Sequence, residues 1–312
     1  QKALVMMADR QSLAANVACL LEAEPLQGQS LEEVEQIALA EIEKVKKGEF
    51  DEELLTSIIN NEKLTFMRIC DMPRALVRAE VNAFIYDIDW KDFVHEIDEL
   101  EKITKDDLVA FANEYLKDNY VQINKLEQPD PNDTRIAKPY ITPIMMNRDA
   151  ASQFLRDIQA SAAAVQPIEP VFVDYQKDMS IATAKSGIPV LYKQNVTNGV
   201  FELQYLFETG SYADNVMPFA ADYLTFLGTD DMTPEEVQKA FYRMAVNMSV
   251  ACSGERTYVS LNGLAENMEE AMELVEKVIA HAQANPEALM MLKGNTVYER
   301  RNAKLDQRSN SA

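Results

Sequence analysis

Hydrophobic residues in the first third of the chain recur at the three- and four-residue spacing of an amphipathic helix. Helices are therefore predicted from Gln1 to about residue 118, with Pro73 interrupting or restarting one of them. Three helices have recognisable N-caps: Ser30 with Glu33, Asp51, and Thr104 with Asp107. After the last helix, residues 120–125 alternate between apolar and polar and predict a strand.

From about residue 171 the pattern changes to short strands mixed with helices. Strands are expected at residues 188–194, 200–208, 245–252 and 257–264. Asn198-Gly199 predicts a hairpin turn between the first two strands, and Ser253-Gly254 a turn between the last two. Helices are expected at residues 218–227, after the caps Thr233 with Glu236 and Asn267 with Glu270, and from Pro286. This order predicts an α+β fold with a mostly antiparallel sheet.

The segment between these parts has a different composition. Its prolines are Pro129, Pro131, Pro139, Pro143, Pro167 and Pro170, and a short helix is expected near residues 150–158. The sequence therefore predicts a first body at 1–126, a linker at 127–170 and a second body at 171–312.

Charge narrows the possible partners. The 312 residues carry a net charge of −21, which repels phosphate backbones and anionic lipids, so nucleic-acid binding is not expected. Solubility is the preferred reading of this charge, and attraction of basic peptides is the weaker alternative. No apolar run is long enough to span a membrane. Because Gln1 is not Met, we expect a mature chain or an excised fragment; a removed signal peptide would favour the periplasm or cell envelope, and otherwise the cytoplasm is expected.

Few residues suit catalysis or metal binding. His95 lies beside Glu96, but a surface or core role is favoured over a general base, and His281 suits a helix C-terminus. Cys19, Cys70 and Cys252 fit neither a zinc site nor a disulfide framework, so buried free thiols are expected. The pair Asp230-Asp231 is interpreted as a solvated turn rather than a cation site. No catalytic or metal-binding residue is therefore predicted, and no cofactor is expected in this chain.

The second body resembles the repeated domain of the insulinase–pitrilysin zinc peptidases. The resemblance rests on the expected strands and on the order of five runs: Phe207–Asp214, Ala220–Thr229, Thr233–Glu236, Val259–Leu264 and Asn267–Leu274. It implies two bodies built from helices packed on mostly antiparallel sheets.

The first body resembles the latter part of the companion domain of the same family, which makes it helix-rich and incomplete. This likeness rests on Glu41–Glu53 and Ile103–Leu108. The bridge Lys138–Ile144 with Asn147–Asp149 resembles that of single-chain bacterial members.

In catalytic domains of this family, the corresponding helix carries His-x-x-Glu-His, whose histidines share one helix face and bind zinc. The matching positions here are Asp222, Thr225 and Phe226, and no histidine lies between His95 and His281. The resemblance therefore implies a non-catalytic repeat with a degenerate metal motif. Glu299 is the nearest candidate for the later glutamate ligand of the family.

The resemblance implies that this chain is a chamber-forming, non-catalytic part of a zinc metallopeptidase. Zinc and peptide hydrolysis would belong to a domain outside the chain, and its partners would be the peptide substrate and the remaining domains of the same polypeptide. An inactive partner or assembly subunit of the same fold, or a peptide-binding module, is the alternative. A His-x-x-Glu-His motif upstream of Gln1 would favour the peptidase.

Overall fold

The computed structural model describes residues 5–12, 17–26, 28–126, 138–144, 147, 150–163 and 165–305. Their contacts form two compact units, the first comprising Gln1–Val121 with Asn195–Ala312 and the second Gln122–Gln194. The expected division at 1–126, 127–170 and 171–312 stays a prediction. Residues 127–137 of the expected linker, together with Arg148 and Asp149, lie outside the described residues.

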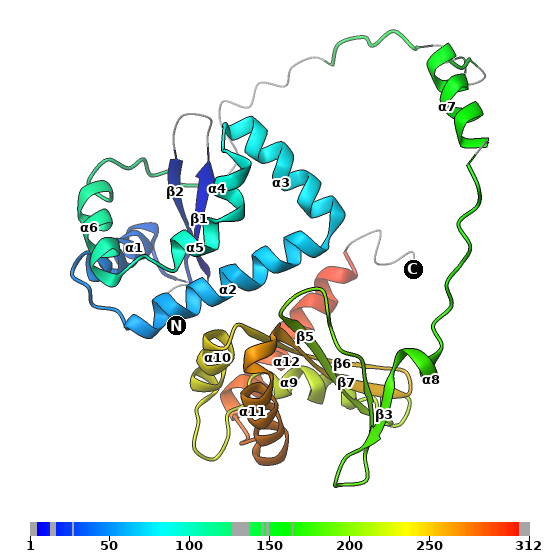
Figure 1. Ribbon diagram of the computed structural model, residues 1–312. Helices are drawn as coiled ribbons and strands as arrows, with labels where there is room; N and C mark the ends of the chain where they lie inside the picture. Colours follow the sequence, from blue (N-terminus) through cyan, green and yellow to red (C-terminus); the bar gives the residue numbers. More distant parts are fainter. Residues whose placement is uncertain are drawn as a thin grey trace. The chain divides into compact units, whose positions relative to one another are not determined.

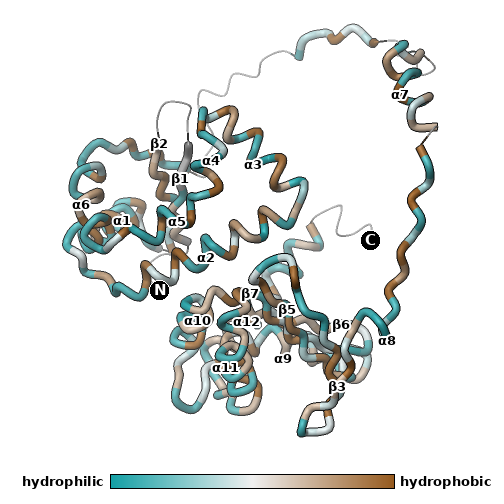
Figure 2. The backbone as a smooth tube through the Cα atoms, viewed as in Figure 1, coloured by the Kyte–Doolittle hydropathy of each residue, from teal (hydrophilic) through white to brown (hydrophobic). Residues whose placement is uncertain are grey.

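The first part of unit 1 is a β-hairpin followed by helices (Figure 1). Its elements are β1 (Val5–Ser12), β2 (Val17–Glu24), α1 (Leu31–Lys46), α2 (Glu52–Asp71), α3 (Pro73–Tyr86), α4 (Trp90–Val94), α5 (Glu96–Leu100) and α6 (Lys105–Tyr115). Helix α1 packs against α6, and α2 packs against α3 and α5. Figure 2 shows hydrophobic and hydrophilic residues alternating along α2, as in a helix with one packed face.

The caps of these helices are confirmed. Ser30 and Glu33 form a capping box at α1, Thr104 and Asp107 form another at α6, and Asp51 accepts a bond from a backbone N–H at the start of α2. Each side chain satisfies an N–H that the first helical turn leaves without a partner.

The predicted helix is wrong at residues 5–12 and 17–21, because β1 and β2 form an antiparallel pair with Asp9 opposite Leu20. The Met, Leu and Ala residues of this region have high helix propensity, which the cross-strand pairing overrides. The predicted strand at residues 120–125 is also absent: these residues form no helix or strand.

The second part of unit 1 is a three-stranded antiparallel sheet packed against helices (Figure 1). Its elements are β5 (Val200–Phe207), α9 (Met217–Leu224), α10 (Pro234–Arg243), β6 (Val246–Ser253), β7 (Arg256–Leu264), the 3₁₀ turn η1 (Ala265–Asn267), α11 (Met268–His281) and α12 (Pro286–Ala303). The strand order is β5-β7-β6. The helices and antiparallel strands confirm the α+β fold class.

Two expectations about this part need correction. The hairpin between the strands flanking Asn198-Gly199 is wrong, because β5 pairs with β7 instead. Asn267 does not form a capping box with Glu270; its side chain donates to the backbone oxygen of Met244, at 2.7 Å.

The main core of unit 1 lies between one face of this sheet and helices α10 and α11. Val259 and Leu261 of β7 are 1–2% exposed and pack with Phe241 of α10 and Val275 of α11. Leu64 of α2 joins a second cluster with Ala245 and Leu264. Residues far apart in the sequence therefore share the packing of unit 1.

Unit 2 contains little regular structure. Its elements are α7 (Gln153–Ala163), α8 (Tyr175–Asp178), β3 (Ser180–Thr183) and β4 (Pro189–Tyr192). Strands β3 and β4 pair antiparallel, with Ile181 opposite Leu191. The expected short helix is confirmed, displaced by a few residues from 150–158.

Candidate functional site

Helix α9 and the residues directly after it carry the three positions Asp222, Thr225 and Phe226. Asp222 is exposed on α9, and its backbone oxygen accepts a 2.8 Å hydrogen bond from Oγ1 of Thr225. Thr225 is the C-cap residue, and Phe226 follows it, half-buried. No group of three or more His, Cys, Asp or Glu residues that could hold a metal occurs among the residues the structure describes.

Phe219, Tyr223, Phe226 and Leu227 recur at helical spacing, which predicts that they form one buried face. The structure buries this face less than the spacing predicts. Leu227 is 8% exposed, as expected, but Phe219, Tyr223 and Phe226 are only half-buried, so full burial of this face is wrong. The most buried residue of α9 is Ala221, at 6% exposure. The small side chain of Ala221 allows close approach of α9 to β6, with which the helix is in contact.

Tyr223 fixes the position of α9 through a pair of hydrogen bonds. Its hydroxyl donates to the backbone oxygen of Asn285 and accepts from the backbone N–H of the same residue, both at 2.7 Å. Asn285 is the N-cap of α12, so the tyrosine joins the two helices. This polar contact is one that the apolar spacing of the sequence does not reveal.

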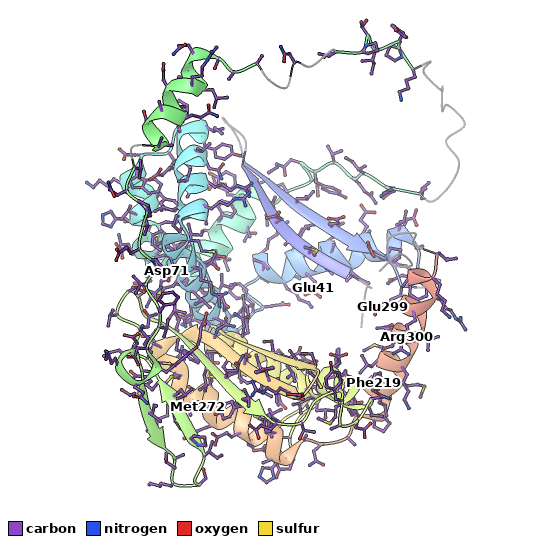
Figure 3. All side chains as sticks on the ribbon, turned by 90° about the vertical axis from the view of Figure 1, so that its right-hand side faces the viewer. Glu41, Asp71, Phe219, Met272, Glu299 and Arg300 are labelled. Carbon is purple, nitrogen blue, oxygen red and sulfur yellow. The ribbon has the colours of Figure 1, made fainter. Side chains whose placement is uncertain are left out.

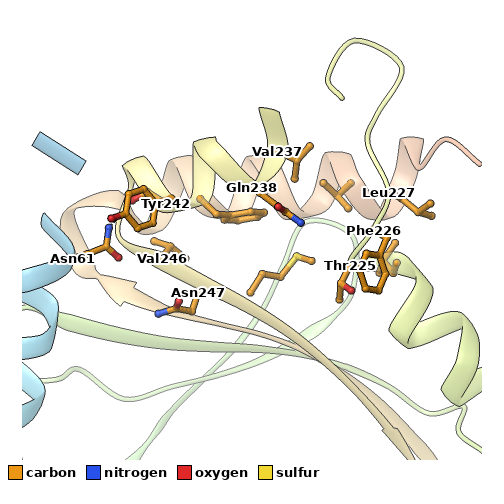
Figure 4. Close-up of a pocket in the computed structure, with 13 residues that line it drawn as sticks. Asn61, Thr225, Phe226, Leu227, Val237, Gln238, Tyr242, Val246 and Asn247 are labelled. Atoms are coloured by element: carbon orange, nitrogen blue, oxygen red, sulfur yellow. The ribbon is translucent and has the colours of Figure 1, made fainter. Parts of the chain in front are cut away.

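A groove of about 320 Å³ opens beside the end of α9 (Figure 4). Thr225, Phe226 and Leu227 line one part of it, and the remaining lining comes chiefly from α10 and β6. The complete lining is Asn61, Leu224, Thr225, Phe226, Leu227, Val237, Gln238, Phe241, Tyr242, Val246, Asn247, Met248 and Val278. None of these side chains is charged, so the groove suits an uncharged group.

Helix α2 contributes one amide to the groove. Asn61 donates to the backbone oxygen of Tyr242 at 2.8 Å and to that of Ser57, also at 2.8 Å. The bond to Tyr242 connects α2 with the end of α10. Leu64, one turn further along α2, packs in the second cluster. Asn61 is a lining residue that sequence reasoning did not identify, since its partner is 181 positions away.

The loop after α9 is held by an ion pair. Asp231 accepts hydrogen bonds from Lys277 at 2.6 Å and from the Thr229 hydroxyl at 2.7 Å. The Lys277 ammonium, followed by that hydroxyl, lowers the pKa of the Asp231 carboxyl. The expected cap is confirmed directly after it, where Thr233 and Glu236 form a capping box at α10.

The sheet face opposite the core is polar. Glu202, Gln204, Asn247 and Ser249 are exposed on this face, and Gln204 donates to the hydroxyl of Ser260 at 3.2 Å. These polar residues alternate with more buried residues along β5 and β6, and this alternation is the sequence signal from which the polar face could be located.

The histidines lie apart from the groove. His95 lies between α4 and α5, where Nδ1 is 2.8 Å from an oxygen of Asp98, and His281 ends α11. Glu299 is exposed on α12, where Figure 3 labels it next to Arg300. Cys19, Cys70 and Cys252 are free thiols, but Cys19 and Cys70 are exposed and Cys252 is only half-buried, so the expectation of buried thiols is wrong.

Comparisons with known proteins found similarity only among solved structures. No family model matches the sequence, and no curated protein does. A peptidase M16 inactive domain from Pseudomonas fluorescens aligns with 17% identity and a TM-score of 0.39, over 41% of this chain and 32% of that one. The periplasmic protease PqqL from Escherichia coli aligns with 13% identity and a TM-score of 0.37, over 99% of this chain and 37% of that one.

A third solved structure is the E83A mutant of the ferredoxin protease FusC in complex with Arabidopsis ferredoxin. It aligns with 13% identity and a TM-score of 0.38, over 99% of this chain and 37% of that one. The chain thus spans about a third of the length of these neighbours. Separately, no helix within the described ranges is long and apolar enough to cross a membrane.

Proposed function

We propose that this chain is a non-catalytic part of an insulinase–pitrilysin-type zinc metallopeptidase. In this proposal it forms part of the chamber wall that faces the peptide substrate. The zinc site and the hydrolytic residues lie in a domain outside these residues, and the remaining domains of the same polypeptide are its structural partners.

The observation that carries the proposal is the chemistry of the three motif positions on and after α9. Zinc sites in proteins use Cys, His or carboxylate ligands. Asp222 alone offers such a group; the Thr225 hydroxyl is bonded to a backbone carbonyl, and Phe226 has no donor atom. These residues do not fit a zinc ion, and we assign no catalytic step to them.

The exposed polar face of the sheet supports the chamber role. Its amide and hydroxyl groups, such as those of Gln204 and Ser249, can exchange hydrogen bonds with a polypeptide, and the carboxylate of Glu202 can accept them. The absence of charge in the groove supports contact with uncharged segments of the substrate.

The direct test is to assay the purified chain for metal and for hydrolysis. After dialysis, elemental analysis is expected to find far less than one zinc per chain, and mass spectrometry is expected to find unfolded polypeptides intact after incubation. Chelator-sensitive cleavage by the pure chain, or stoichiometric zinc that is lost in Asp222→Ala, would refute the proposal. A non-catalytic partner subunit remains the rival, and the coding sequence upstream of Gln1 distinguishes the two by the presence or absence of His-x-x-Glu-His.

A further inference from the structure

An asparagine that precedes a glycine can react with its own backbone, because the glycine nitrogen approaches the side-chain carbonyl carbon with no Cβ in the way. The chain contains two such pairs, Asn198-Gly199 in the loop before β5 and Asn262-Gly263 within β7. Both pairs have the same local chemistry, so a difference in their reactivity has to come from the fold.

At Gly199 the attacking nitrogen is available. This glycine is exposed, and its N–H donates to no acceptor among the residues that the structure describes. Its carbonyl oxygen accepts a hydrogen bond from the N–H of Ala265 at 2.8 Å, which holds the residue in place. Water can therefore remove the proton from a nitrogen whose position is already fixed.

The side chain of Asn198 is folded toward that nitrogen. Its Oδ1 accepts hydrogen bonds from the N–H of Val200 at 3.0 Å and from the side-chain amide of Asn195 at 2.6 Å. A bond to the N–H two residues ahead forms an Asx turn, which brings the carboxamide carbon beside the intervening nitrogen of Gly199. The two donors also stabilise the negative charge that develops on Oδ1 when the nitrogen attacks that carbon.

At Asn262-Gly263 the fold prevents the same reaction. Gly263 is buried in the central strand β7, opposite Phe201 on one side and Val246 on the other. A Cβ atom on this glycine would lie 2.4 Å from the backbone oxygen of Ala245, so the neighbouring backbone confines it closely. Because an extended strand cannot bend without breaking its ladder, the Gly263 nitrogen cannot reach the side chain of Asn262.

We propose that Asn198 deamidates spontaneously in the folded protein, whereas Asn262 does not. The nitrogen of Gly199 loses its proton to water and forms a bond to Cγ of Asn198. The bond from Cγ to Nδ2 then breaks, and Nδ2 takes up a proton and leaves as ammonia. Water opens the resulting succinimide ring at either carbonyl, which gives aspartate or isoaspartate at position 198. This inference goes beyond the proposed function and does not depend on it.

The modification changes a contact within unit 1. Nδ2 of Asn198 donates a hydrogen bond to Asp71, the last residue of α2, which is labelled in Figure 3. After the reaction this donor is gone, and a carboxylate at position 198 faces the carboxylate of Asp71. Two like charges at this separation repel each other. The reaction therefore releases the end of α2 from the loop before β5.

The test incubates the full chain at mildly alkaline pH and follows the loss of each asparagine by mass spectrometry of its peptides. Chromatography separates the aspartate and isoaspartate products. Asn198 is expected to react about tenfold faster than Asn262 or more, because reaction at Asn262 requires the sheet to open first. In a chain unfolded by guanidinium chloride, the two asparagines are expected to react at similar rates. Loss of Asn198 that is no faster than loss of Asn262 in the folded chain would overturn the proposal.

A pair of variants tests the attack by the Gly199 nitrogen. Gly199→Ala has room for its Cβ, since the nearest atom, Cε of Met67, is 3.7 Å away. The added Cβ hinders ring closure, so loss of Asn198 is expected to slow about tenfold. Gly294→Ala, where the new Cβ meets no atom within 4 Å, is the control and should leave the rate at Asn198 unchanged. Thermal melts check that both variants are folded, and an unchanged rate in folded Gly199→Ala would rule out this attack.

An exchange of charges tests the consequence for α2. Asn198→Asp, which carries the aspartate product, is expected to melt at a lower temperature than the original chain. Adding Asp71→Asn places a new amide donor opposite the new carboxylate and is expected to recover the loss. The recovery should exceed the effect of Asp71→Asn alone, because the two residues are in contact. Unchanged melting of Asn198→Asp would contradict the release of α2.

Discussion

At Thr225, the side chain oxygen that could have faced a substrate bonds to the backbone of its own helix. The next residue, Phe226, contributes a half-buried ring to the wall of the groove. The residues on and directly after α9 therefore contribute to packing and not to metal ligation. The sequence predicted the three motif positions through resemblance, but their exposure depends on how closely Ala221 lets the helix approach the sheet.

Phe226→Ala is expected to lower the free energy of unfolding by about 1–2 kcal/mol. This is less than the roughly 3–5 kcal/mol of a fully buried phenylalanine, because the Phe226 side chain is only partly buried. Asp222→Ala, at an exposed position on the same helix, is the matched control and should change stability by about 0.5 kcal/mol or less. Urea unfolding measures both. A neutral Phe226→Ala together with a severe Asp222→Ala would show that the polar position is the constrained one.

At the scale of elements, the helix caps could be predicted from the sequence, whereas the pairing of the strands could not. The capping boxes at Ser30, Thr104 and Thr233 depend on residues three positions apart, and all three are present. The partner of β5 depends instead on β7, more than fifty residues later, and the Asn198-Gly199 signal carries no information about it. The N-terminal hairpin was missed for a related reason, since its residues favour a helix locally.

The turn after α9 gives a prediction at this scale. A Cβ atom on Gly228 would overlap the backbone oxygen of Met232 and approach the nitrogen of Pro234 to 2.9 Å. Since backbone atoms cannot move aside independently, Gly228→Ala is expected to cost about 1–3 kcal/mol. Gly294→Ala, in the exposed part of α12 with no atom within 4 Å of the new Cβ, should instead stabilise by about 0.5–1 kcal/mol. Thermal unfolding of the two variants should move in opposite directions; a shift of the same sign in both would contradict this account.

At the scale of the molecule, unit 1 is assembled from two separate stretches of sequence. Composition marked the segment between them, because its prolines and bland residues stand out, but composition cannot reveal that α2 packs with the strand β7. That contact rests on Leu64 meeting Leu264, and α2 also contacts α10, where the amide of Asn61 donates to the backbone oxygen of Tyr242. These are tertiary contacts, and the sequence around each of these residues shows only the usual pattern of a helix or a strand.

Limited proteolysis tests whether the two stretches of unit 1 stay packed together after the chain between them is cut. Residues 138–144 form no helix or strand, and Tyr140 and Ile141 are 86% and 71% exposed, so brief chymotrypsin treatment is expected to cut here first, after Tyr140. The two fragments should then elute together from a sizing column, since unit 1 contains residues from both. Leu64→Asp should let them separate, whereas Leu54→Asp, at an exposed site on the same helix, should not. Separation of the original fragments after the cut would instead favour two independently packed bodies.

The split of unit 1 has a consequence for the order in which the chain folds. Asn61 leaves the ribosome 181 residues before its partner Tyr242, and Leu64 waits even longer for Leu264. The equilibrium cost of this separation is small, since each doubling of a closed loop adds only about 0.6 kcal/mol. The kinetic cost is larger, because contacts between distant residues slow folding and leave apolar surface exposed meanwhile. During synthesis, α2 therefore presents an uncovered leucine until the last strand of the sheet has been made.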